Sequence, residues 1–368
     1  MMYADIEGNI GYRMTGLVPI RDPSFTGSWV VPGEGDPAYD WKGFIPFEEM
    51  PASLNPPEDF IVTANNRITP PTYPRTITYD WDSGSVGYRT KRITDLICQA
   101  EQAGHPLTRD DMPLIQLDYR SYMVVDLLRG ARALGLDGPK ATEPPLSMSA
   151  NAAAAVRALG NWTVDPPVGS SEATLVTMWR RALAHRLSAS TGGVIWENPG
   201  WLWNIMQSGD SVSCPDGCGV LLAQALADVE RAEGGLVKAV GRGRGAERRL
   251  QWGVGLHMGM FEHLILSKTP LKCLADRGIG HGGDGSSINV GKVSLIEAHG
   301  DLQQVAGPSY RQIVDLGEIE SSRYLNPLGQ DGNEFSSGYD ALLEKWAEGE
   351  YLPMSVTSYG GVELKLKP

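Results

Sequence analysis

Apolar and polar positions divide the chain into three parts with different periods. Residues 1–87 have short apolar runs separated by turn residues, a pattern typical of strands and turns. From residue 88 to residue 250 apolar positions recur every three or four residues, which predicts helices. Residues 251–368 return to short mixed segments rich in Gly and Asn. We therefore expect an α+β chain, residues 1–368, with strands at both ends and a large helical region between them.

Two strand-like patterns stand out in the first part. YADIEGNIGY (3–12) has two short apolar edges around a Glu, Gly and Asn turn, and so predicts a hairpin. FIVTA (60–64) has strong β propensity and predicts a strand that ends at two adjacent asparagines, Asn65 and Asn66. Residues 18–57 combine Pro and Gly with spaced aromatics, so we expect an ordered but irregular surface segment there.

Helical periodicity begins at Tyr88. Ile93, Leu96, Ile97 and Ala100 follow the i, i+3, i+4, i+7 spacing of an amphipathic helix within residues 87–104. Thr108 and Asp111 resemble a capping box, and we expect one helix to continue from there to Gly135. The same periodicity predicts further helices within residues 149–160, 171–187, 220–235 and 339–351.

Composition narrows the function classes. The hydrophobic fraction of 42% and charged fraction of 21% in 368 residues are ordinary for a globular protein. A net charge of −12 argues against a nucleic-acid partner. No apolar run approaches the roughly 18–20 residues that span a bilayer, and we expect no membrane partner. The N-terminal sequence MMYADIEGNIGY lacks the basic region and apolar core of a signal peptide.

Cysteines and histidines give no metal signature. The four cysteines are too few and too scattered for a disulfide scaffold. Cys214 and Cys218 have C-x3-C spacing without a second Cys/His pair for zinc, which leaves a local disulfide or two free thiols. His257 and His263 are six residues apart and do not share a helix face, so packed or hydrogen-bonded histidines are expected there.

Short catalytic motifs are also missing. GRGRGA (241–246) and GIGHGG (278–283) match the glycine pattern of dinucleotide sites, but neither has the required strand before it and helix after it. The chain contains no G-x-S-x-G elbow, no S-x-x-K and no P-loop. It therefore has no self-contained catalytic signature.

Several longer blocks of sequence follow one another along the chain. They are YADIEGNIGYRMTGLVPIR, VPGEGDPAYDWKGFIPFEEMP, NPPEDFIVTANNRI, GYRTKRI, QWGVGLHMGMFEH, HGGDGSSIN, GPSYRQIVDLG and GQDGNEFSSGYDALLEKWAEGEY. In this order and spacing they specifically resemble the β-chain of the penicillin acylase family of N-terminal nucleophile hydrolases. It covers most of the chain and is weakest between residues 140 and 250.

The resemblance implies a fold and a missing group. The family fold is a four-layer α/β/β/α sandwich, of which this chain would supply a part. Family members cleave themselves to expose an N-terminal nucleophile, usually Ser, whose α-amine acts as its own base. That nucleophile lies well over a hundred residues upstream of the YADIEGNIGY block. We therefore expect it to be absent from this chain, since the thioether of Met1 cannot form an acyl ester.

The resemblance also assigns site residues. By position, Asn65 matches the asparagine whose side-chain N–H contributes to the family's oxyanion hole, where a fixed, uncharged donor is needed. Arg89 matches an arginine that orients the nucleophile's amine and the oxyanion asparagine through its rigid fork of donors. For Asn66 a turn or a structural hydrogen bond is the simpler role, with substrate binding as the other.

These assignments define an expected function. The chain would be the C-terminal fragment of an amidohydrolase that hydrolyses linear amides of N-acylated small molecules through an acyl-enzyme, and it would be inactive alone. Its partners would be the substrate, the missing α-chain and the N-terminal part of the β-chain. No cofactor is required for the chemistry, no metal ligand is assigned, and a structural calcium ion is possible in the complete protein. The chain itself leaves the location unknown, and the resemblance implies a periplasmic or secreted one.

Two alternatives remain open at this point. The chain could be a separately encoded subunit of a split acylase whose partner carries the nucleophile. It could also be a non-catalytic binding module on the same fold.

The expected domain organisation is a single acylase fragment that comprises residues 1–368. Within it we expect a strand part (1–87) that carries the asparagine pair, a helical part (88–250) and a mixed C-terminal part (251–368).

Overall fold

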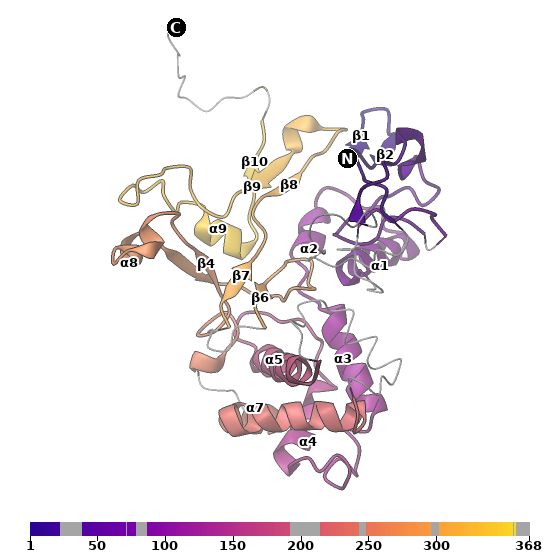
Figure 1. Ribbon diagram of the computed structural model, residues 1–368. Coiled ribbons are helices and arrows are strands. Elements are labelled where there is room, and N and C mark those ends of the chain that lie inside the picture. Colours follow the sequence, from indigo (N-terminus) through magenta and orange to yellow (C-terminus); the bar gives the residue numbers. More distant parts are fainter. Residues whose placement is uncertain are drawn as a thin grey trace. The chain divides into compact units, whose positions relative to one another are not determined.

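The computed structural model describes residues 1–22, 39–70, 72–78, 87–191, 214–242, 248–295, 302–355 and 357 (Figure 1). The chain forms two compact units, Met1–Thr94 and Asp95–Pro368. Helices are combined with small β-sheets, and the expected α+β class is confirmed. Within the described ranges, no helix has both the length and the apolar character needed to cross a bilayer.

The first unit opens with the predicted hairpin. Strands β1 (Met2–Ala4) and β2 (Ile10–Arg13) pair antiparallel, and β3 (Ala52–Leu54) adds to the other side of β2. The described residues of segment 18–57 are largely irregular, as expected, apart from a short 3-10 helix, η2 (Phe47–Glu49), and an isolated bridge. Strand β3, which lies in the same segment, was not predicted. Residues 23–38 of that segment lie outside the described ranges. A small core holds the unit together, consisting of Val18, Ile45, Met50 and Ile77.

The strand predicted at residues 60–64 is wrong. This stretch is irregular and leads into a bend at Asn65. β-Branched residues favour extended backbone, but a strand also needs a hydrogen-bonded neighbour. The sheet of this unit is completed by β3, and none of the described residues pairs with residues 60–64.

The helical part follows most of the predicted pattern. Four of the expected helices form as α1 (Tyr88–Gln102), α4 (Ala150–Leu159), α5 (Ser171–Thr191) and α7 (Cys218–Gly241). The single helix expected from Thr108 to Gly135 is wrong. It is divided into α2 (Met112–Gln116) and α3 (Tyr122–Ala133).

Polar side chains explain this division. The Asp111 carboxylate accepts hydrogen bonds from both the backbone N–H and the hydroxyl of Thr108, each at 2.7 Å, in the turn directly before α2. The Ser121 hydroxyl accepts from the backbone N–H of Val124 at 3.4 Å and caps α3. A side chain that binds a free backbone donor stabilises a new helix start, and Ser121 does so within an apolar periodic run.

Helix α7 packs against both α4 and α5 and forms the main helical core (Figure 1). Trp179 of α5 is fully buried and donates its indole N–H to the carbonyl of Leu222 in α7 at 2.9 Å. Much of the rest of this core is leucine, including Leu175, Leu183, Leu187, Leu222 and Leu226. Burial of large apolar side chains is the dominant stabilising term for such a helix layer.

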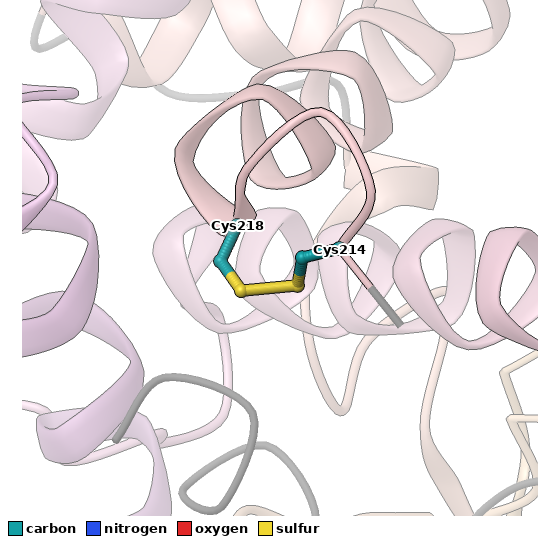
Figure 2. The surroundings of a disulfide bond; sticks show 2 residues. All are labelled: Cys214 and Cys218. Carbon is teal, nitrogen blue, oxygen red and sulfur yellow. A yellow bond between two sulfur atoms is a disulfide. The ribbon is translucent and has the colours of Figure 1, made fainter. Parts of the chain in front are cut away.

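A disulfide joins Cys214 to Cys218 at the start of α7 (Figure 2). The two Cα atoms are 4.9 Å apart, and the bond closes the turn that leads into the helix. Of the two alternatives that the sequence left open, the disulfide is the one formed. Cys98 and Cys273 are free thiols.

Residues 251–355 form two further sheets. One has the order β5-β4-β7-β6, with strands β4 (Met258–Phe261), β5 (Arg277–Gly280), β6 (Lys292–Val293) and β7 (Gln304–Ala306). The other has the order β10-β9-β8, with β8 (Arg311–Ile313), β9 (Arg323–Leu325) and β10 (Leu352–Pro353). A short helix, α8 (Lys272–Ala275), precedes β5, and the predicted C-terminal helix forms as α9 (Leu343–Glu348). Trp346 of α9 is fully buried in a cluster with Leu325 and Leu343.

The loop after β5 contains a buried carboxylate that ties distant elements together. Asp284, only 4% exposed, accepts a hydrogen bond from the Ser121 hydroxyl at 2.7 Å and lies 3.4 Å from the Arg180 guanidinium of α5. Its other oxygen accepts from the backbone N–H of Ser286 at 2.7 Å. One side chain thus joins the loop, the cap of α3 and the middle of α5.

Buried histidines lie beside this loop. His257 stacks on Trp252 with ring centroids 3.8 Å apart, and its two ring nitrogens lie 3.0 and 2.6 Å from the carbonyl oxygens of His281 and Gly291. His257 is therefore packed and hydrogen-bonded, as predicted. His281 is 1% exposed and stacks on Trp346.

Stability is expected to fall as the pH drops from about 6.5 to about 4. Burial, with repulsion from His257 and Arg311, lowers the pKa of His281 to about 4. In this window the unfolded chain binds a proton at His281 and the folded chain does not, so acid favours unfolding, by about 3 kcal/mol over the window. Burial lowers the pKa of His257 as well, which acts in the same direction. Urea unfolding at several pH values measures the effect.

The variant His281→Phe keeps a stackable ring and removes the titrating group. Its unfolding free energy should depend less steeply on pH between 4 and 6.5 than that of the unmodified chain. His185→Gln, at an exposed position, serves as the control and should keep the original slope. An unchanged slope in His281→Phe would rule out His281 as a source of the acid sensitivity.

Candidate active site

Asn65 has an unusual backbone conformation at the end of residues 60–64. Its φ is +60°, in the left-handed region that few non-glycine residues adopt, although asparagine tolerates it best. The chain bends at Asn65, and the Asn65 side chain contacts Arg89, 24 residues further along the chain. Such backbone positions occur often at functional sites, where surrounding contacts maintain them.

Arg89 contacts the Asn65 side chain directly. One guanidinium nitrogen of Arg89 (Nη2) donates to the Asn65 carboxamide oxygen (Oδ1) at 2.6 Å. Arg89 is the second residue of α1, so the helix start determines where its guanidinium lies. Burial lowers the pKa of Arg89 from its ordinary value, yet a guanidinium remains charged at any working pH.

This contact fixes the orientation of the amide. An arginine side chain only donates, so it identifies the Asn65 end that faces it as the oxygen. The Asn65 Nδ2 group, with two N–H donors, must then point away from Arg89. It has no hydrogen-bond acceptor among the residues that the structure describes, and it is available to a negatively charged oxygen.

Asn66 has a different environment. Its side-chain oxygen accepts from the backbone N–H of Ala64 at 3.0 Å, and its side-chain nitrogen donates to the carbonyl of Arg67 at 2.9 Å. Both ends of the Asn66 amide are therefore engaged by local backbone. These two contacts are hydrogen bonds of the structural kind that the sequence favoured for Asn66.

The structure thus brings together the two residues to which the sequence assigned catalytic roles. The site differs from a complete oxyanion hole in one respect, which is that Asn65 is exposed. The described part of the chain does not itself exclude water from this amide. The donor and the group that orients it are present, whereas the enclosure is not.

Gly87 is a site component that sequence reasoning missed. Its carbonyl accepts the first helical hydrogen bond of α1 from Lys91 at 2.9 Å, and its φ is +52°. A Cβ atom at Gly87 would lie 3.0 Å from the Cβ of Asn66. The sequence does contain a signal for it. Gly87 lies directly before a run with helical periodicity, and glycine is accepted at helix N-caps.

The other glycine-rich and metal-binding motifs add no second candidate site within the described residues. The match GIGHGG runs from β5 into a loop that no helix follows, and GRGRGA falls partly on residues 243–247, outside the described ranges. Over the described residues, no group of three His, Cys, Asp or Glu side chains lies close enough to hold a metal ion.

The sequence of this chain is similar to known proteins over most of its length. The family model described as penicillin amidase matches residues 1–360. Penicillin acylase 2 proenzyme of Pseudomonas sp. is 26% identical over 96% of this chain and 43% of its own length. An acyl-homoserine lactone acylase, QuiP, of Pseudomonas fluorescens is 25% identical over the whole chain and 46% of its own length. The chain spans less than half the length of these two relatives.

A solved structure shows the same fold. Thermostable penicillin G acylase from Alcaligenes faecalis aligns over the whole of this chain and 67% of its own, with a TM-score of 0.62 and 18% sequence identity. At this level of identity the similarity concerns the fold alone. The arrangement of Asn65 and Arg89 rests on the geometry described above.

Proposed function

The chain belongs to the penicillin amidase family, and from that premise we propose that it supplies the oxyanion-stabilising side of an amidohydrolase active site. The observation that carries the proposal is the hydrogen bond from Arg89 to the oxygen of Asn65, which leaves the amide N–H groups to donate. A tetrahedral intermediate carries negative charge on the former carbonyl oxygen, and a positioned uncharged donor stabilises it.

The nucleophile in this proposal comes from polypeptide outside residues 1–368. An N-terminal Ser or equivalent residue attacks the carbonyl of the substrate amide, and its own α-amine accepts the proton. The protonated α-amine gives this proton to the leaving amine, and an acyl-enzyme remains. Water, losing a proton to the same α-amine, then attacks the ester, and the proton returns to the nucleophile oxygen as the acid is released. Asn65 donates to the oxyanion in both the acylation and the deacylation step.

Arg89 acts on the reaction through Asn65. Its fixed positive charge holds the Asn65 oxygen, so the amide does not have to reorient as negative charge develops in the transition state. Pre-oriented donors of this kind avoid a reorganisation cost at the moment of reaction. Arg89 is therefore a positioning residue for the oxyanion donor, and in the complete site it also orients the nucleophile's amine.

The substrate class in this proposal is an N-acylated small molecule. Both the penicillin acylase and the acyl-homoserine lactone acylase among the relatives support it by their names. In the complete enzyme the chain would form part of a four-layer α/β/β/α sandwich. The Cys214–Cys218 disulfide supports a periplasmic or secreted location, because disulfides persist in oxidising compartments.

An activity assay tests this function. The complete enzyme is residues 1–368 together with the nucleophile-bearing polypeptide of the same source. It should hydrolyse a chromogenic phenylacetyl amide or an N-acyl-homoserine lactone, with both products detected by chromatography. Residues 1–368 alone should show no turnover. The proposal fails if the complete enzyme hydrolyses no acyl amide, or if the isolated chain is active.

A further inference from the structure

We propose that Asn66 and Gly87 are positioning residues that hold Asn65 in its left-handed conformation within reach of Arg89. This inference deepens the proposed function and rests on it for its catalytic consequence. The effect of Asn66 and Gly87 on the Asn65 side chain can be tested without an activity assay.

Asn66 closes a turn around the strained residue. Its side-chain oxygen is bound to the N–H of Ala64, one residue before Asn65, and its side-chain nitrogen is bound to the carbonyl of Arg67, beyond Asn65. The Asn66 amide therefore bridges backbone groups on both sides of Asn65. The left-handed region is less favourable than the right-handed one even for asparagine, which tolerates it best, and these two bonds stabilise Asn65 there.

Gly87 sets the distance between this turn and helix α1. Its backbone lies so close to Asn66 that an added Cβ atom would come within 3.0 Å of the Asn66 Cβ. Its left-handed φ of +52° disfavours any side chain as well. Arg89 follows Gly87 by two residues. This close contact therefore determines the position of the first turn of α1, which carries Arg89.

Together, Asn66 and Gly87 position both Asn65 and the helix that carries Arg89. The turn around Asn66 positions the Asn65 amide, and the contact between Asn66 and Gly87 positions the helix that carries Arg89. The 2.6 Å hydrogen bond between Arg89 and Asn65 then closes the arrangement. Loss of either constraint should release the Asn65 side chain without removing Asn65 or Arg89.

Gly104 offers a matched control at the other end of the same helix. Its φ of +69° makes a side chain as unfavourable as at Gly87, but an added Cβ atom would meet nothing within 4 Å. Gly87→Ala and Gly104→Ala therefore share the backbone strain. They differ in the collision with Asn66.

The first experiment monitors the Asn65 side-chain amide by NMR in the full chain labelled with 15N-asparagine. The signal is assigned by its loss in Asn65→Ala, and Arg89→Ala gives the position of the released amide. Asn66→Ala and Gly87→Ala should move the signal toward that position, whereas Gly104→Ala should leave it unchanged. Asn66→Asp keeps the acceptor for Ala64 and should retain the original signal more closely than Asn66→Ala.

Unchanged Asn65 signals in both Asn66→Ala and Gly87→Ala would overturn the inference. If Gly87→Ala does not fold, the comparison between Asn66→Ala and Asn66→Asp decides the question. These readouts need no turnover, so they remain valid even if the proposed function fails.

Kinetics of the complete enzyme test the catalytic consequence. Asn66→Ala should lower kcat about 10- to 100-fold with little change in KM, because a displacement of about 1 Å in a site costs up to about 100-fold. In an Asn65→Ala background the same substitution should have no further effect, since it acts through Asn65. A further loss of the same size in that background would show a general structural role instead.

Discussion

Replacement of Asn65 by Ala in the complete enzyme is expected to lower kcat about 100- to 1,000-fold, or roughly 3–4 kcal/mol of transition-state stabilisation. The substitution removes the N–H groups that the Arg89 contact directs away from the helix. KM should change little, because the oxyanion forms only during the reaction. Steady-state hydrolysis of a phenylacetyl amide measures both constants.

Asn55 provides the control for this prediction. It is also an asparagine with left-handed backbone, at φ +46°, and its side chain bonds to Asn9 and to the backbone of Ile10. Asn55→Ala should reduce stability and leave kcat unchanged. A kcat for Asn65→Ala within about twofold of the unmodified enzyme would remove Asn65 from the mechanism.

The second large effect concerns stability. Asp284→Ala is expected to lower the free energy of unfolding by about 3–5 kcal/mol, because it breaks a buried ion pair with Arg180 and leaves the Ser121 hydroxyl without its carboxylate acceptor. Asp284→Asn retains an oxygen acceptor and should cost less. Urea denaturation of the full chain at neutral pH measures both variants.

Asp331 is the matched control for Asp284. It lies in an exposed loop and its carboxylate accepts from the backbone of Asn333 at 3.0 Å, so it forms a local turn without a buried partner. Asp331→Ala should cost about 1 kcal/mol or less. Equal losses in Asp284→Ala and Asp331→Ala would show that the buried network does not contribute as described.

Local sequence signals predicted much of the fold. The hairpin of residues 3–12 was predictable because its turn residues and apolar edges lie within ten positions. Helices α4 and α5 carry their own periodicity, and Ser149 caps α4 through the backbone N–H of Ala152. Features that depend on neighbours close in sequence are the ones that a single sequence reveals.

Features that depend on distant partners were not predictable. The break between α2 and α3 involves Ser121, whose hydroxyl is bound by Asp284, 163 residues away. The residues FIVTA favour a strand by propensity, but no described residue pairs with them. In both cases tertiary context decides between local alternatives of similar energy.

The candidate site was likewise predictable only in part. Family resemblance pointed to Asn65 and Arg89, which lie 24 residues apart and are in contact. The left-handed backbone of Asn65 and its dependence on Asn66 could not be inferred from composition or spacing, because asparagine pairs are also common in ordinary turns. The close approach of Gly87 likewise appears only when the turn and the helix are seen together.

In the proposed mechanism, Asn65 presents a side-chain N–H to the oxyanion while Arg89 holds its oxygen. The most direct measurement is a crystal structure of the complete enzyme with a boronic acid bound to the nucleophile as a tetrahedral adduct. We predict Asn65 Nδ2 about 2.7–3.1 Å from the boronate oxygen that represents the oxyanion, with Arg89 still bound to Oδ1. A boronate oxygen held by other donors, with the Asn65 amide turned away from it, would contradict the claim.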